Sequence, residues 1–193
     1  NADTGFCYAI TNYRQVLKNC TFEGNVNQNI NNVASLYINV PGPFTLSDCD
    51  FLYNEAASAA AVWAEQQVKL TIENCNFVGN RAMGGAGSRV PNGGAVIVCG
   101  ITTIKNCLFA DNYAKNKGGA LYIAGGQYGA GFVTVISSEF VNNSAGIAGG
   151  AIYIEGDLTV DNENTADADS TIFKDNFVNL RLNSANIFSI WKI

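Results

Sequence analysis

The 193-residue sequence contains no histidine and only one methionine. Without histidine the chain cannot form a Ser-His-Asp or Cys-His catalytic arrangement. It also lacks the commonest general base and every zinc site that uses imidazole. Several enzyme classes are therefore excluded before any motif is considered.

Positive charge is also scarce. Lys and Arg number 11 against 16 Asp and Glu, which gives a net charge of -5, and no basic run interrupts the sequence. A nucleic-acid partner would require a basic stripe, so the composition disfavours one. No apolar run reaches the roughly 18 residues of a membrane span, so we expect no membrane-spanning helix.

Cysteine is too sparse for a disulfide scaffold. Six cysteines in 193 residues lie well below the roughly 8–10% typical of such scaffolds. Their positions are more informative than their number, because four of them belong to a repeat.

The repeat is Phe-x-x-Asn, which occurs six times. Successive repeat Phe residues are 29, 26, 32, 31 and 33 residues apart. The members are Phe22, Phe51, Phe77, Phe109, Phe140 and Phe173, with Asn25, Asn54, Asn80, Asn112, Asn143 and Asn176. A repeat of this length indicates stacked supersecondary units.

Each unit carries two strand signals. The first ends at the Phe and has an apolar residue five positions before it, then a small residue two positions before it, namely Cys20, Cys49, Cys75, Cys107, Ser138 and Thr171. The second has an alternating pattern, as in Ala120-Leu121-Tyr122-Ile123, and Gly-Gly precedes it in three units. Period-2 alternation favours strands.

Residues that occupy the same place in every unit are here called a column. Columns that recur once per unit predict parallel strands stacked about 4.8 Å apart. We therefore predict an all-β fold: a right-handed parallel β-helix (β-solenoid) of about six coils, because crossovers between parallel strands favour that hand. Residues 1–193 are expected to form a single β-helix domain. Since the sequence starts at Asn1 without methionine, we expect a processed product or an excerpt of a longer solenoid.

Two columns are expected to form internal stacks. Stacked Asn amides can bond to one another and to turn backbone, so the Asn column is interpreted as structural. Cys20, Cys49, Cys75 and Cys107 should lie one above another, but their parallel side chains suit the disulfide torsion poorly. We favour buried free thiols, while local pairing of Cys7 with Cys99 stays open.

The central residues of the second strand should point outward as an exposed aromatic stripe. These candidates for binding or assembly are Tyr8, Tyr37, Trp63, Tyr122, Tyr153 and Phe188, with Ile97 in the same column. Such a stripe marks a binding or assembly surface. The alternative is that the aromatic side chains only stabilise the sheet or that a loop covers them.

Two weaker signals concern modification and metal. Asn19 and Asn142 begin N-x-Ser/Thr sequons, which matter only in a protein secreted by a eukaryote. The acidic segment with Asp157, Asp161, Glu163, Asp167 and Asp169 offers calcium ligands but lacks the spacing of known calcium loops. A solvated acidic loop is the simpler interpretation, and we expect no metal and no other cofactor.

The combination of Cys-x-Phe-x-x-Asn with Gly-Gly-Ala at Gly93, Gly118 and Gly149 resembles the repeats of the chlamydial polymorphic outer-membrane proteins. The resemblance covers nearly the whole chain, and we do not expect these 193 residues to include the transporter barrel of those proteins. It implies a right-handed β-helix that is secreted or displayed at a cell surface and used in adhesion.

Three functions follow as hypotheses. The first is a non-catalytic structural or adhesive module whose partner is a cell-surface glycan or protein. The second is self-assembly, end to end or laterally, because uncapped solenoid ends pair readily. The third is a polysaccharide-binding or polysaccharide-degrading protein of the pectate-lyase-like fold. For a lyase or hydrolase, however, Lys18, Lys69 and Lys105 are scattered and Asp48 and Asp50 stand alone.

Overall fold

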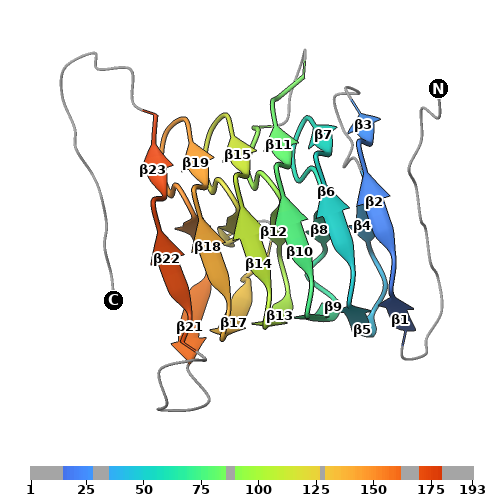
Figure 1. Ribbon diagram of the computed structural model, residues 1–193. Coiled ribbons are helices and arrows are strands. Elements are labelled where there is room, and N and C mark those ends of the chain that lie inside the picture. Colours follow the sequence, from blue (N-terminus) through green and yellow to red (C-terminus); the bar gives the residue numbers. More distant parts are fainter. Residues whose placement is uncertain (1–14, 28–34, 86–89, 127–128, 162–169, 180–193) are drawn as a thin grey trace.

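The computed structural model describes residues 15–27, 35–85, 90–126, 129–161 and 170–179. Within these ranges every strand belongs to one of four parallel sheets, here called A to D, and the chain passes through them in the order A, B, C, D before returning to A. Figure 1 shows the resulting coils stacked side by side along one axis. The predicted parallel β-helix of about six coils is confirmed.

The strands of each sheet come from successive coils. Sheet A contains β1 (Gln15–Lys18), β5 (Gly42–Ser47), β9 (Val68–Glu73), β13 (Ile101–Lys105), β17 (Phe132–Ile136) and β21 (Asp157–Asp161). Sheet B contains β2 (Thr21–Glu23), β6 (Asp50–Leu52), β10 (Asn76–Val78), β14 (Leu108–Ala110), β18 (Glu139–Val141) and β22 (Ile172–Lys174). Sheet C contains β3 (Val26–Asn27), β7 (Glu55–Ala56), β11 (Arg81–Ala82), β15 (Tyr113–Ala114), β19 (Ser144–Ala145) and β23 (Phe177–Val178). Sheet D contains β4 (Leu36–Ile38), β8 (Val62–Ala64), β12 (Val96–Val98), β16 (Leu121–Ile123) and β20 (Ile152–Ile154).

The repeat Phe residues form one stack through the core. They pair with one another in register along sheet B. Their ring centroids are 4.6 to 5.0 Å apart, and the planes of neighbouring rings differ by at most 13°. This spacing is the distance between neighbouring strands, so the backbone ladder fixes the ring stack. Phe51, Phe77, Phe109 and Phe140 are completely buried.

The repeat Asn residues form a hydrogen-bonded ladder at the corner between sheets B and C. The Nδ2 of Asn80 donates to Oδ1 of Asn112 in the next coil, at 3.0 Å, and to the carbonyl of Phe51 in the preceding coil, at 2.9 Å. The backbone N–H of Asn80 also donates to Oδ1 of Asn112. Asn54, Asn112 and Asn143 repeat this pattern. Buried amides are thus satisfied from coil to coil.

The small column of Cys, Ser and Thr has a related role. Cys20, Cys49, Cys75 and Cys107 carry free thiols, and each Sγ donates to the carbonyl two residues earlier, at 3.1 to 3.3 Å. Ser138 makes the same bond through Oγ, at 2.8 Å. Serine can therefore replace cysteine in this column, because both are small side chains that can donate a hydrogen bond.

Two kinds of corner explain the polar and glycine positions of the repeat. Asn19, Asp48, Asn74, Asn106 and Ser137, between sheets A and B, all have a left-handed φ of 45° to 55°. In the Gly-Gly pairs the first glycine is left-handed, with φ 69° at Gly118. The second has no room for a side chain, because a Cβ on Gly119 would lie 2.0 Å from the Gly150 carbonyl.

Candidate functional site

The aromatic stripe lies on sheet D, the sheet behind sheet B in Figure 1. Tyr37 pairs in register with Trp63, Trp63 with Ile97, Ile97 with Tyr122, and Tyr122 with Tyr153. Their neighbours along each strand are buried, except at β20, so the side chains of the stripe point away from the core. They form a cluster of their own together with Ala59, Cys99 and Ala124.

The expected exposure of the whole stripe is wrong for its middle. Tyr122 is 7% exposed and Ile97 is 3% exposed, because aromatic neighbours in adjacent coils and the flanking turns cover them. Tyr37, Trp63 and Tyr153 are half-buried and keep accessible surface. Tyr8 and Phe188 lie outside the described residues. The accessible part of the stripe is therefore Tyr37, Trp63 and Tyr153.

A recurring Tyr–Glu hydrogen bond holds the stripe in place. The hydroxyl of Tyr37 donates to Oε1 of Glu65 at 2.7 Å. Burial, together with a hydrogen bond to Glu155 in the next coil, raises the pKa of Tyr122. Each glutamate follows, by two residues, the residue that pairs in register with its tyrosine. Glu65 follows Trp63, the partner of Tyr37, and Glu155 follows Tyr153, the partner of Tyr122. The stripe thus combines aromatic surface with a carboxylate at its edge.

Lys117 adds a positive charge beside the last two tyrosines. The rings of Tyr122 and Tyr153 stack with centroids 5.6 Å apart. The Nζ of Lys117 donates to the Tyr153 hydroxyl at 2.8 Å and lies 3.8 Å from Oε1 of Glu155. Amine, phenol and carboxylate groups therefore converge at this end of the stripe, where they can form hydrogen bonds with a polar ligand.

The charged residues considered for polysaccharide chemistry lie at another edge. Asp48 forms an ion pair of 3.3 Å with Lys18, and the hydrogen bond from Lys18 lowers the pKa of Asp48. Asp50 accepts a hydrogen bond from Asn76 at 2.8 Å. Lys69 and Lys105 lie in neighbouring strands of sheet A, but Lys105 pairs in register with Glu73. These groups do not converge on one point.

The predicted metal ligands and sequons lie only partly within the described residues. In that part, no group of three or more Cys, Asp or Glu residues is placed to hold a metal ion. Asp157 and Asp161 bound β21, whereas Glu163, Asp167 and Asp169 lie outside the described residues. Asn19 and Asn142 are both exposed at left-handed corners. The described residues include no helix that could span a membrane.

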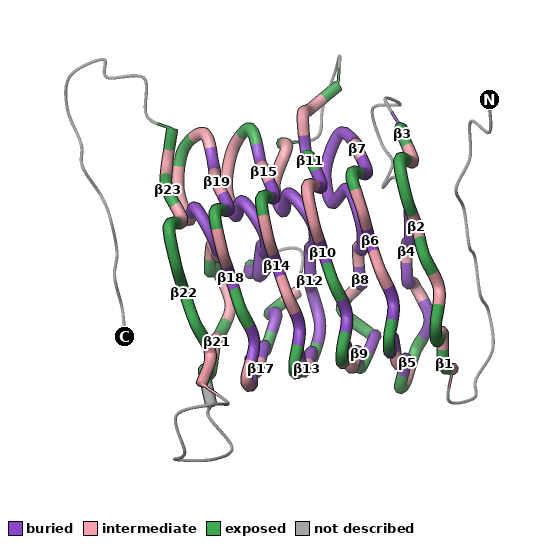
Figure 2. The backbone as a smooth tube through the Cα atoms, in the orientation of Figure 1, coloured by how far each residue is buried: buried purple, intermediate pink, exposed green. Residues whose placement is uncertain are grey.

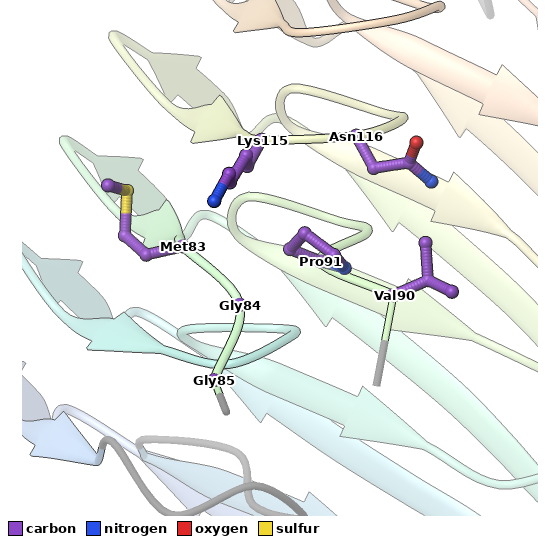
Figure 3. A pocket seen from close by; sticks show the side chains of 7 residues that line it. All are labelled: Met83, Gly84, Gly85, Val90, Pro91, Lys115 and Asn116. Atoms are coloured by element: carbon purple, nitrogen blue, oxygen red, sulfur yellow. The ribbon is translucent and has the colours of Figure 1, made fainter. Parts of the chain in front are cut away.

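An open cavity of about 450 Å³ lies at the edge of sheet C (Figure 3). It is lined by Met83, Gly84, Gly85, Val90, Pro91, Lys115 and Asn116. Two of these lining residues are joined by a hydrogen bond, in which the backbone N–H of Asn116 donates to the Pro91 carbonyl at 3.1 Å. None of the residues predicted from the sequence lines this cavity.

The geometry agrees with the comparison against protein families. Residues 1–165 match the model described as the right handed beta helix region. The chain belongs to the right-handed β-helix family. The predicted handedness is therefore that of the family. The comparisons with curated proteins and with solved structures give no match.

One exposed cluster of this β-helix was missed by sequence reasoning. Tyr53, on the corner between sheets B and C, is 62% exposed. On the strands of sheet C that follow this corner, Arg81 and Tyr113 pair in register and form a cation–π contact of 5.4 Å from Cζ to the ring centroid. A signal was present, because Tyr53 directly precedes a ladder Asn, where the other units have Gly24, Gly79, Asp111, Asn142 and Asp175.

Proposed function

We propose that this β-helix is a non-catalytic structural or adhesive module of a secreted or cell-surface protein. It binds a cell-surface glycan or protein through the accessible part of the stripe on sheet D. The observation that carries the proposal is the row of half-buried aromatic side chains with Glu65 and Glu155 beside it. Aromatic surface with fixed polar groups at its edge is typical of binding surfaces.

The rigidity of the scaffold supports the same role. Tyr37, Trp63 and Tyr153 stand on strands locked by backbone ladders and by the buried Asn ladder behind them. Side chains held in this way lose little conformational entropy when a ligand binds. The repeat resemblance to the chlamydial polymorphic outer-membrane proteins supports an adhesive module at a cell surface, which is part of this proposal.

A glycan array probed with the purified protein tests the proposal, followed by affinity measurement on the best ligand. Trp63→Ala should reduce the affinity about 10-fold or more, as expected for an aromatic anchor. Phe132→Ala is the matched control, because Phe132 is 49% exposed and lies on sheet A. If Trp63→Ala and Phe132→Ala bound the ligand with equal affinity, sheet D would not be part of the binding surface.

A second candidate is end-to-end assembly, favoured by the exposure of core columns in the last described coil. Phe173 is 43% exposed and stands on β22, which Figure 2 colours as exposed, although Phe140, one coil earlier, is completely buried. Val160 is 44% exposed, whereas its register partner Val135 is completely buried. Exposed edges and apolar ends of parallel sheets favour pairing with another copy.

Mass photometry at several dilutions and negative-stain microscopy test the assembly. If copies stack, regular rods longer than one molecule persist on dilution, and Val160→Lys shortens them. A monodisperse monomer at all concentrations would refute the stacking. The alternative is that the protein is a polysaccharide lyase or hydrolase. If incubation with a panel of polysaccharides released products, the non-catalytic proposal would be refuted in favour of this activity.

A further inference from the structure

The corner between sheets B and C requires a left-handed residue in every coil, directly before the ladder Asn. Five of the six positions have residues suited to this conformation: Gly24, Gly79, Asp111, Asn142 and Asp175, with φ between 53° and 67°. The sixth is Tyr53, with φ 55°. A bulky side chain is a true outlier in this region, and such outliers gather at functional sites.

The Tyr53 ring rests on the backbone of the next coil. A Cβ placed on Gly79 would lie 2.5 Å from Cδ1 and 2.8 Å from Cε1 of Tyr53, so only glycine leaves room for the ring. Tyr53 is nevertheless 62% exposed. The ring is therefore supported from below by Gly79 and open to solvent above, which makes it a flat apolar platform.

Charged residues of both signs stand at this corner and on the strands of sheet C that follow it. Glu55, Arg81 and Tyr113 are register neighbours on sheet C, two residues beyond Tyr53, Gly79 and Asp111 respectively. The guanidinium of Arg81 lies over the Tyr113 ring, 5.4 Å from its centroid. Arg81 and Asp111 are exposed and Glu55 is half-buried. The site thus offers an aromatic face, hydrogen-bond donors and hydrogen-bond acceptors within neighbouring coils.

We propose that Tyr53, Arg81 and Tyr113, with Glu55 and Asp111, form a binding site for a neutral saccharide. A sugar ring has C–H groups on its face, which pack on the aromatic platform, and hydroxyls on its rim, which both donate and accept hydrogen bonds. Two carboxylates against one guanidinium disfavour an anionic sugar. This site lies on a different face from the stripe of sheet D and extends the proposed function to a second contact.

The test uses arrays of neutral hexose and N-acetylhexosamine oligosaccharides, with uronic-acid and sulfated oligosaccharides for comparison. Tyr53→Asn should reduce affinity for the best neutral ligand about 10-fold or more, since it removes the stacking platform. Tyr53→Phe keeps the platform and should retain affinity within about threefold. Phe132→Ala, an exposed aromatic residue on sheet A outside both sites, should leave this affinity unchanged.

Stability provides an independent readout. Asn142 already occupies the equivalent position, so Tyr53→Asn should leave the thermal midpoint unchanged or raise it by about 2–4 °C. A lower midpoint would assign Tyr53 a structural role and overturn the proposal. Binding of anionic sugars only, absence of any neutral ligand, or normal binding by Tyr53→Asn would also overturn it. Loss of binding in Trp63→Ala alone would support the stripe and reject this site.

Discussion

Asn112 occupies the middle of the Asn ladder and should be among the most sensitive polar positions in the chain. It is completely buried. Its Oδ1 accepts from the backbone N–H and the Nδ2 of Asn80, both at 3.0 Å. Its Nδ2 donates to the Phe77 carbonyl at 2.8 Å and to Oδ1 of Asn143 at 2.9 Å.

Replacing this side chain with alanine removes all four bonds and strips partners from three buried groups: the N–H of Asn80, one hydrogen of its Nδ2, and the carbonyl of Phe77. Each group left without this partner costs about 1–3 kcal/mol. Because relaxation recovers part of the loss, we expect Asn112→Ala to lower the free energy of unfolding by about 3–6 kcal/mol. This is a large share of the roughly 5–15 kcal/mol typical of a domain.

Asn25→Ala is the matched control at the first rung. The Asn25 amide donates to Asn54 and Ser35, and the backbone N–H of Asn25 still reaches Oδ1 of Asn54 after the substitution. No buried donor loses its partner, so the expected cost is only about 1 kcal/mol. Urea unfolding followed by circular dichroism compares the two variants with the parent protein.

Equal costs for Asn112→Ala and Asn25→Ala would refute the argument that ladder position sets the energy. Asn112→Asp gives a pH-dependent check. A carboxylate cannot donate to Phe77 or Asn143, so the folded state favours the protonated acid and raises the pKa above the usual value of about 3.9. Stability of this variant is therefore highest below about pH 4 and falls as pH rises through the folded pKa.

Two further predictions concern the glycine pairs and the thiols. Gly119→Ala places a Cβ 2.0 Å from the Gly150 carbonyl and should cost about 3 kcal/mol or more. Gly126 differs from Gly119 in having a left-handed φ of 63°, but a Cβ there would meet no atom within 4 Å, so Gly126→Ala should cost only about 1 kcal/mol, from the backbone conformation. Denaturant unfolding compares the pair, and similar costs would exclude steric contact as the cause. Burial raises the pKa of the Cys49 thiol from 9.0 to about 11, so iodoacetamide should label it in the native protein only slowly at neutral pH. The stability that this thiol contributes is present below pH 9.0 and is lost as pH rises through about 11; alkaline unfolding that is unchanged in Cys49→Ala would contradict this.

The repeat was sufficient to predict the fold, because side chains that recur once per unit can contact their equivalents only when the units stack. Phe77 and Asn80 illustrate this: neither has a partner within its own unit, and each finds its partners one coil away. Period-2 alternation around Tyr122 likewise identified the strand and its outward residue correctly.

The solvent exposure of the aromatic side chains could not be derived from the same repeat positions. Alternation states which way a side chain points, but neighbours in adjacent coils decide how much of it remains accessible. Tyr122 and Tyr153 occupy the same column, yet Tyr122 is buried between neighbouring coils and the flanking turns while Tyr153 keeps accessible surface. The candidate binding surface therefore contracted to Tyr37, Trp63 and Tyr153 only when the coils were placed in space.

The sequence alone thus determined the β-helix, its stacks and its corners, since these follow from residue spacing and from the hydrogen-bonding capacity of each side chain. Only the tertiary structure decided which aromatic side chains reach solvent. It also brought Tyr53 onto Gly79 and Arg81 beside Tyr113, residues 26 and 32 positions apart in the chain. Contacts between coils depend on register and loop length together, and no single unit of the repeat contains that information.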